Sequence, residues 1–191
     1  MIVRLWTRQD KRSLEAIEKY GVYRVKRDYI IEQFGDIAYH YIELYKWFVR
    51  IAGGRVCKPE GVDFPIWCAI SKESMYVPTQ DTVVYELEID ESEVIYFDGR
   101  KWDFVLNHHY IPVDKDDEEK YFKDIERLGL IDSYSFFEGK YANFYPLEKR
   151  RIINSWVRIF DIEDWNVFGV QANIWEIRKN MIKKIIELKE Q

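Results

Sequence analysis

Apolar residues recur three and four positions apart along six stretches of the chain, a spacing that places them on one face of a helix. The clearest stretch runs over residues 27–52 and is closed by Gly53 and Gly54. Gly21 ends the first stretch, because glycine readily adopts the left-handed conformation that follows a helix. Pro146 suits the first turn of the fifth stretch. The predicted helices cover residues 14–20, 27–52, 102–107, 114–128, 146–160 and 181–188.

Short segments rich in β-branched and aromatic residues lie before and between these helices and predict strands. Pro78 lies in a polar connection between two of the strands, and an acidic turn over residues 90–93 follows the second. The strands do not alternate regularly with the helices, which favours an α+β fold with small mixed or antiparallel sheets. We expect a single domain over residues 1–191. The predicted strands cover residues 2–7, 22–25, 64–71, 83–89, 94–97 and 167–177.

The charge and composition narrow the classes of function. The formal net charge is -5 and the pI is about 5.4, so binding to nucleic acid by charge alone is not expected. No apolar stretch predicts a membrane span, and the first residues lack the features of a secretory signal. Cys57 and Cys68 are expected to be reduced thiols. These observations together predict a cytoplasmic protein, with 17% aromatic residues as its unusual feature.

The sequence contains none of the common signatures of catalytic or metal-binding sites. His40, His108 and His109 lack the spacing of a zinc site, and no phosphate-binding glycine loop or serine elbow occurs. The neighbouring His108 and His109 are interpreted as one packed and one half-exposed side chain rather than as a ligand pair. The charged run over residues 114–120 is interpreted as the solvated start of a helix, where carboxylates complement the helix dipole. We therefore expect no bound metal.

The alternation of residues along the predicted strands places polar and aromatic side chains together. Arg4 and Trp6 share one face of the first strand, and Gln171 and Asn173 share one face of the late strand. Trp67 lies on a strand between them in sequence. Aromatic rings, amides and guanidinium groups suit a planar, phosphorylated ligand. Ordinary packing is the alternative reading, since Trp at alternating positions commonly lies in a core.

Several short motifs resemble the bacterial family known as domain of unknown function 3841, over nearly the whole chain. The likeness weakens over residues 70–73 and again over residues 114–145. This resemblance implies a fold and a cytoplasmic setting, and it implies no reaction. The motifs that carry it are LWT at 5–7, GVY at 21–23, PIWCA at 65–69, VYELEI at 84–89, Trp102 with VLN at 105–107, SWVRIFD at 155–161 and VQANIWE at 170–176.

The order of the predicted elements also resembles that of small ADP-ribosyltransferases, which implies a split sheet with NAD between its parts. The resemblance implies that Arg4 or Thr7 grips the ribose and diphosphate, that Tyr23 or Trp67 stacks on the nicotinamide, and that Gln171 orients the ribose. The candidate residues are Arg4, Trp6, Thr7, Tyr23, Trp67 and Asn107 for the cofactor, and Gln171 and Glu176 for catalysis.

Glu176 is the acidic alternative to Gln171, but regular alternation places it on the opposite face of the strand. A transferase with glutamine here could be slow, could use a base from its target, or could be a relative without catalysis. Two hypotheses therefore stay open. The first is an NAD-binding ADP-ribosyltransferase-like enzyme, and the second is a binding protein, such as a small-molecule sensor or an inhibitor in phage–host conflict. RNA binding by base stacking is a third and less favoured class.

Overall fold

A computed structural model describes residues 1–188, and it confirms the predicted α+β fold. The chain divides into two compact units, which are described separately below. Unit 1 contains Met1–Tyr96 together with the described residues from Asp164 onward, and unit 2 contains Phe97–Glu163. The expectation of one domain over residues 1–191 stays a prediction, because two compact units can belong to one domain or to two.

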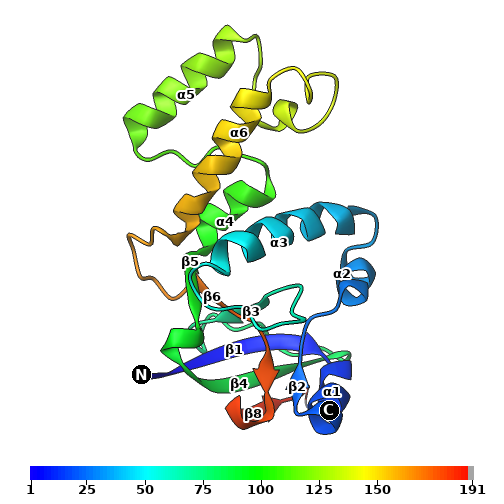
Figure 1. Ribbon diagram of the computed structural model, residues 1–191. Helices are drawn as coiled ribbons and strands as arrows, with labels where there is room; N and C mark the ends of the chain where they lie inside the picture. The colour runs from blue at the N-terminus through cyan, green and yellow to red at the C-terminus, as the bar shows by residue number, and fades with distance from the viewer. Residues whose placement is uncertain (189–191) are drawn as a thin grey trace. The chain divides into compact units, whose positions relative to one another are not determined.

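A six-stranded sheet forms the frame of unit 1, and its strands run in the order β5-β6-β3-β1-β4-β8 (Figure 1). The pairs β1–β3, β1–β4, β3–β6 and β4–β8 are antiparallel. A second, two-stranded antiparallel sheet joins β2 (Val22–Tyr23) to β7 (Ile177–Arg178). The strands of the larger sheet are β1 (Ile2–Asp10), β3 (Ile66–Ala69), β4 (Thr82–Asp90), β5 (Ile95–Asp98), β6 (Val170–Ile174) and β8 (Ile182–Ile186).

The first predicted helix is confirmed, whereas the second is interrupted. The helix α1 (Arg12–Tyr20) ends at Gly21, whose φ of 71° is the left-handed conformation expected there. The single helix predicted over residues 27–52 is wrong, because Gly35 breaks it with a φ of 53° and a ψ of -127°. The result is α2 (Arg27–Phe34), a 3-10 turn η1 (Gly35–Ile37) and α3 (Ala38–Ala52).

The prediction of a closing amphipathic helix over residues 181–188 is wrong. A 3-10 turn η5 (Lys179–Met181) leads instead into strand β8, which pairs with β4 through Val84 opposite Ile186 and Glu86 opposite Lys184. The segment is rich in isoleucine, and β-branched side chains fit a pleated surface well. Pairing with the edge of β4 supplies backbone hydrogen bonds, whereas a solvent-exposed helix as short as this one is only marginally stable in water. The strand predicted over residues 167–177 is likewise divided into β6 and β7.

Unit 2 is helical, and its helix starts follow the capping rules. Asp98 accepts hydrogen bonds from the backbone N–H groups of Arg100 and Lys101 at the start of α4 (Gly99–Leu106). Asp114 accepts one from Asp117 N at 2.8 Å at the start of α5 (Lys115–Arg127), so the interpretation of this charged run as a helix start is confirmed. The remaining elements are η3 (Tyr134–Phe136), α6 (Pro146–Ser155) and η4 (Trp156–Phe160).

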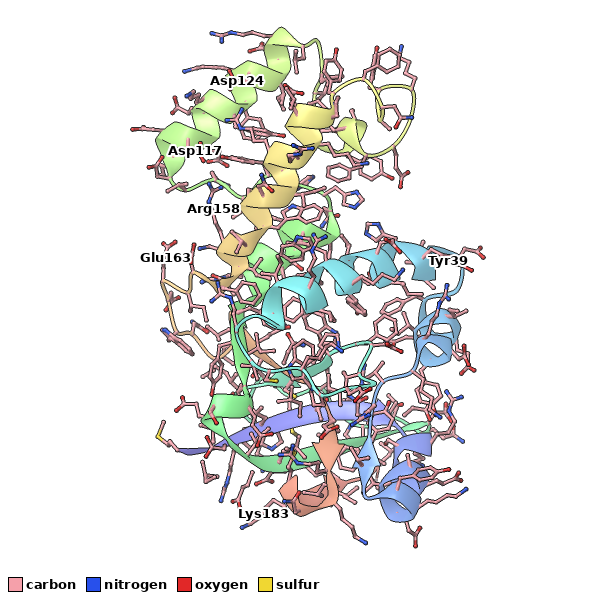
Figure 2. The ribbon with its side chains drawn as sticks, viewed as in Figure 1. Tyr39, Asp117, Asp124, Arg158, Glu163 and Lys183 are labelled. Carbon is pink, nitrogen blue, oxygen red and sulfur yellow. The ribbon has the colours of Figure 1, made fainter. Side chains whose placement is uncertain are left out.

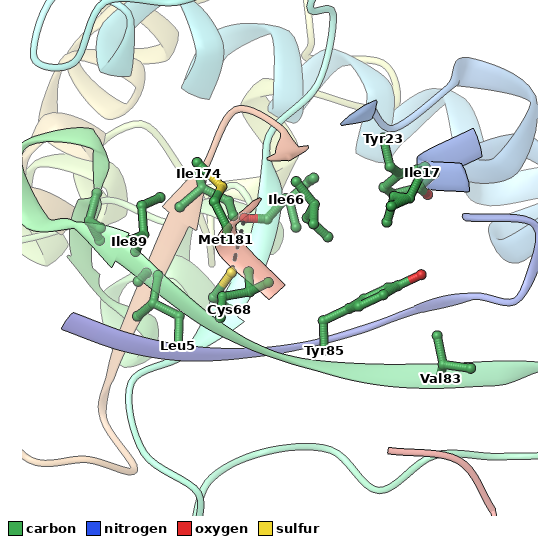
Figure 3. Close-up of a cluster of buried hydrophobic side chains, with 14 residues drawn as sticks. Leu5, Ile17, Tyr23, Ile66, Cys68, Val83, Tyr85, Ile89, Ile174 and Met181 are labelled. Atoms are coloured by element: carbon green, nitrogen blue, oxygen red, sulfur yellow. Dashed lines mark hydrogen bonds between the residues drawn. The ribbon is translucent and has the colours of Figure 1, made fainter. Parts of the chain in front are cut away.

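The hydrophobic core of unit 1 lies against one face of the six-stranded sheet (Figure 3). Leu5 and Leu87 face each other across β1 and β4 and are almost fully buried. Tyr85 is also fully buried, and its hydroxyl forms a 2.8 Å hydrogen bond with Ser13 Oγ of α1. Burial of each large apolar side chain contributes about 2 kcal/mol to folding. This face therefore supplies much of the stability of unit 1.

Candidate functional site

The opposite face of the same sheet carries a row of polar and aromatic residues. Trp6 of β1 lies directly opposite Ala69 of β3 on one side and Glu86 of β4 on the other. Ala69 lies opposite Gln171 of β6, and Glu86 lies opposite Lys184 of β8. Directly opposed residues point to the same face of a sheet. The row Gln171–Ala69–Trp6–Glu86–Lys184, which we call the polar row, therefore crosses five strands.

The dimensions of the sheet give the scale of the polar row. Neighbouring strands are about 4.8 Å apart, so the backbones at Trp6 and Glu86 are separated by about 5 Å and those at Trp6 and Gln171 by about 10 Å. Ala69 carries only a methyl group between Trp6 and Gln171. The backbones of Gln171 and Glu86 therefore lie on opposite sides of the Trp6 backbone within the sheet.

Arg4 and two carboxylates form an ion-pair cluster beside the polar row. Arg4 lies opposite Glu88, and its guanidinium nitrogens lie 3.1 Å from Glu88 Oε1 and 3.7 Å from Glu86 Oε1. Lys183 also pairs with Glu88 at 3.3 Å. The hydrogen bond from Lys183, followed by the one from Arg4, holds the pKa of Glu88 below its ordinary value. The side chain of Glu86 is only 17% exposed, whereas that of Arg4 is 55% exposed.

Two buried polar atoms at this face lack a hydrogen-bond partner among the described residues. They are Nε1 of Trp6 and Oδ1 of Asn173. The amide nitrogen of Asn173 donates to the Ile66 carbonyl at 3.2 Å, so only its oxygen is left without a partner. Such groups destabilise a fold by about 1–3 kcal/mol each, and they are rare in native proteins.

Trp67 shares this face but lies under a helix. It is directly opposite Asn173 of β6. Its ring contacts Tyr45 and Phe48 of α3, with both ring centroids 5.3 Å away. The predicted shared face of Arg4, Trp6, Trp67 and Gln171 is thus present, and both tryptophan side chains on it are half-buried.

Three of the candidate residues lie elsewhere. Thr7 points to the core face, where its hydroxyl donates to the Trp67 carbonyl at 2.7 Å. Tyr23 is buried in the hydrophobic core, as Figure 3 shows, and burial raises the pKa of its phenol. Asn107 belongs to unit 2, where its amide donates to the Asp103 carbonyl at the end of α4. The structure therefore does not bring these three side chains to the polar row.

Glu176 lies beyond the end of β6 in a separate ion-pair network. Its carboxylate contacts Arg24 at 2.8 Å and Arg178 at 3.5 Å, and only 10% of its side chain is exposed. Arg178 continues to Glu93 at 2.7 Å. A second nitrogen of Arg24 donates to the Glu60 carbonyl at 3.0 Å. This arrangement suits a structural role in holding β2, β7 and their neighbouring loops together.

Sequence reasoning missed Glu86 of the polar row, and it placed Lys184 in a helix instead of a strand. The signal was present, because Glu86 and Glu88 alternate with Tyr85, Leu87 and Ile89 in β4. That alternation predicts two carboxylates on one face of the strand. It did not reveal that β1 would place Trp6 beside Glu86, since the register between distant strands is set by the whole sheet.

The described residues offer few other sites of recognised chemistry. Within residues 1–188, no group of three or more His, Cys, Asp or Glu side chains comes together that could hold a metal ion. No helix in this part of the chain is long and apolar enough to cross a membrane. Cys57 and Cys68 are both free thiols, and burial raises the pKa of Cys68 to about 12. Cys68 is therefore protonated and unreactive near neutral pH.

Comparison with known proteins identifies a family and no closer relative. Neither the curated proteins nor the solved structures contain a match to the chain. A family model described as a domain of unknown function matches residues 4–183, which include Gln171, Ala69, Trp6 and Glu86 of the polar row but not Lys184. The chain therefore belongs to the family known as domain of unknown function 3841.

Proposed function

We propose that the protein is a cytoplasmic NAD-binding enzyme of the ADP-ribosyltransferase type, and that the polar row is its cofactor site. The observation that carries this proposal is the register that places Gln171, Trp6 and Glu86 in one line across the sheet. The row combines an aromatic surface, an amide and a carboxylate, with Arg4 next to them. These are the groups that a dinucleotide with a cleavable glycosidic bond requires.

Each side chain has a distinct task in this proposal. Trp6 provides the surface on which the nicotinamide ring stacks, and Gln171 forms hydrogen bonds with a ribose hydroxyl. Arg4 binds the diphosphate, for which its planar guanidinium offers paired donors. Its pair with Glu88 joins two partly exposed side chains, and such pairs contribute little stability. Exchange of this contact for a phosphate oxygen is therefore energetically accessible.

The reaction transfers the ADP-ribosyl group from nicotinamide to a nucleophile. The bond between the ribose carbon and the nicotinamide nitrogen breaks, and its electron pair leaves with neutral nicotinamide. Positive charge develops on the ribose, and the Glu86 carboxylate stabilises it. The nucleophile then forms the new bond and releases its proton to solvent. Low exposure of Glu86 strengthens this electrostatic effect, because less water screens the carboxylate.

The decisive experiment incubates the purified protein with NAD and follows nicotinamide release by chromatography, with NAD affinity measured by calorimetry. Turnover with wild-type protein and about 100-fold slower turnover with Glu86→Gln are expected, since the variant retains shape and loses the charge. Glu18→Gln is the matched control, because Glu18 is an exposed residue of α1 outside the polar row. Absence of both NAD binding and turnover would refute the proposal.

A protein-binding role is the second candidate, and one observation favours it. Tyr76 and Val77 are 66% and 68% exposed in the loop before β4. Arg8 lies 4.9 Å from the Tyr76 ring and donates to the Val77 carbonyl at 3.3 Å. Arginine and aromatic residues are enriched at protein interfaces. The test is capture of a partner from a bacterial lysate. A stoichiometric protein that binds the wild type, does not bind Tyr76→Ala and is captured equally with and without NAD supports this second role.

A further inference from the structure

We propose that unit 2 carries a phosphate-binding site on the exposed side of α6. A solvent-open hollow of about 370 Å³ lies there, within the size range of sites that hold small ligands. Its lining includes Arg150, Arg151, Arg158 and Asn154. Asn154 is four positions after Arg150 and three after Arg151, so these three residues share one side of α6, and Arg158 follows in η4. The proposal uses unit 2 alone and does not depend on the proposed function.

The lining of the hollow carries three arginines in a chain whose net charge is -5, and one of them, Arg151, is paired with Asp124 behind the hollow. All of its lining residues belong to the described part of the chain, and none of them is Asp or Glu. Three guanidinium groups around one hollow repel one another, and a bound anion relieves this repulsion. Arginine is the side chain best suited to phosphate, because its planar donors match two phosphate oxygens at once.

Two of the three arginines are held in place by contacts behind the hollow. Arg151 donates to Asp124 Oδ2 of α5 at 2.9 Å and lies 5.2 Å from the Tyr110 ring. Arg158 donates to the Ile111 carbonyl and lies 5.5 Å from the same ring. Figure 2 shows Asp124 on α5 and Arg158 beside the lower end of α6. Each guanidinium has five N–H donors, so both retain donors for a ligand.

The segment that contains Tyr110 is fixed to α6 and η4, so the hollow is preorganised. The hydroxyl of Ser155 accepts a hydrogen bond from Ile111 N at 2.9 Å and donates to the Ile152 carbonyl at 2.6 Å. The indole of Trp156 donates to the His109 carbonyl at 2.8 Å. Tyr110 itself donates to Asp117 Oδ2 at 2.8 Å. Binding therefore requires little ordering of the backbone, which favours affinity.

Arg150 and Asn154 are the lining residues that structural contacts leave available. Among residues 1–188, the structure shows no ion pair, hydrogen bond or ring contact for either side chain, and both are exposed. They are four positions apart on α6, so they lie next to each other. A phosphate held by Arg150 and Asn154, with the remaining donors of Arg151 and Arg158 around it, satisfies all four groups.

The test uses the full chain and two probes, inorganic phosphate and adenosine monophosphate, with affinities measured by calorimetry at constant ionic strength. Arg150→Gln is expected to weaken the binding of both probes about tenfold, which is the usual effect of one charge-assisted contact. Lys115→Gln is the matched control, because Lys115 is an exposed cation of unit 2 outside the hollow, and we expect less than a twofold change. Arg150→Lys should be intermediate, since lysine keeps the charge and loses the paired donors.

Amide NMR shifts of wild-type protein provide a second readout that needs no variant. Phosphate should move the signals of Asn154 and its neighbours on α6 and should leave those of α4 in place. Tighter binding of adenosine monophosphate than of phosphate identifies an ester as the ligand, and equal binding identifies the free anion. Equal weakening by Arg150→Gln and Lys115→Gln, or no saturable binding below about 10 mM, overturns the proposal.

Discussion

The two faces of the six-stranded sheet are built by the same strands and differ in almost every other respect. On the core face, Leu5, Tyr85 and Leu87 are fully or almost fully buried. On the other face, the intervening residues Arg4, Trp6 and Glu86 form ion pairs and the polar row. Because side chains alternate along a strand, one segment can contribute to stability and to a binding surface without conflict. We therefore expect substitutions on the core face to lower stability, and substitutions on the face of the polar row to change binding instead.

Leu87→Ala tests the core face and should have the largest effect. Leu87 has no exposed surface, so its truncation leaves a cavity and lowers the free energy of unfolding by about 3 kcal/mol. Urea denaturation measures the change. Lys184→Ala is the comparison on the polar row, where we expect a change below about 0.5 kcal/mol because the side chain is exposed. Equal losses for the two variants would contradict the division between the faces.

Trp6→Ala tests the polar row. Loss of the stacking surface should weaken NAD binding about tenfold, since stacking on one aromatic side chain contributes roughly 1–3 kcal/mol. Calorimetry with NAD gives the affinity, and Trp6→Phe should restore part of it. The control is Trp165→Ala, which removes an exposed indole of unit 1 away from the row. A Trp6→Ala protein that melts at a lower temperature but binds NAD normally would assign Trp6 to packing alone.

Acidification provides the third and smallest test, through Glu88. Lys183 and Arg4 hold the pKa of this carboxylate below its ordinary value of 4.5. A lowered pKa in the folded protein means that the stabilising contribution is complete above pH 4.5 and is lost as the pH falls through the folded value. Glu88→Gln should therefore flatten the fall in melting temperature below pH 4.5. Parallel curves for wild type and variant would show that the cluster contributes nothing.

Local chemistry accounts for the elements that could be predicted from the sequence. Gly21 ends α1 and Asp114 caps α5, because both effects involve only neighbouring residues. The break at Gly35 was missed, since the apolar spacing continues across it. The closing strand β8 was also missed. Its isoleucines fit a helix face as well as a strand, and only the unpaired edge of β4 selects between them.

The candidate site was likewise predictable from the sequence only in part. Alternation was sufficient to place Arg4 with Trp6 and Gln171 with Asn173, because the period of a strand is local. It could not show that Trp67 lies beneath Tyr45 and Phe48 of α3. It could not show either that Tyr23 is buried in the core, since helix packing depends on contacts between distant parts of the chain.

The sequence by itself determined the α+β class, the family and the faces of individual strands, all of which depend on local spacing and short motifs. Only the tertiary structure decided which faces meet. It placed Glu86 beside Trp6 through the register of β1 with β4, and it gathered Arg150, Arg151 and Arg158 around one hollow. The physical reason is that register and helix packing are collective properties, set by the burial of a whole face rather than by any one residue.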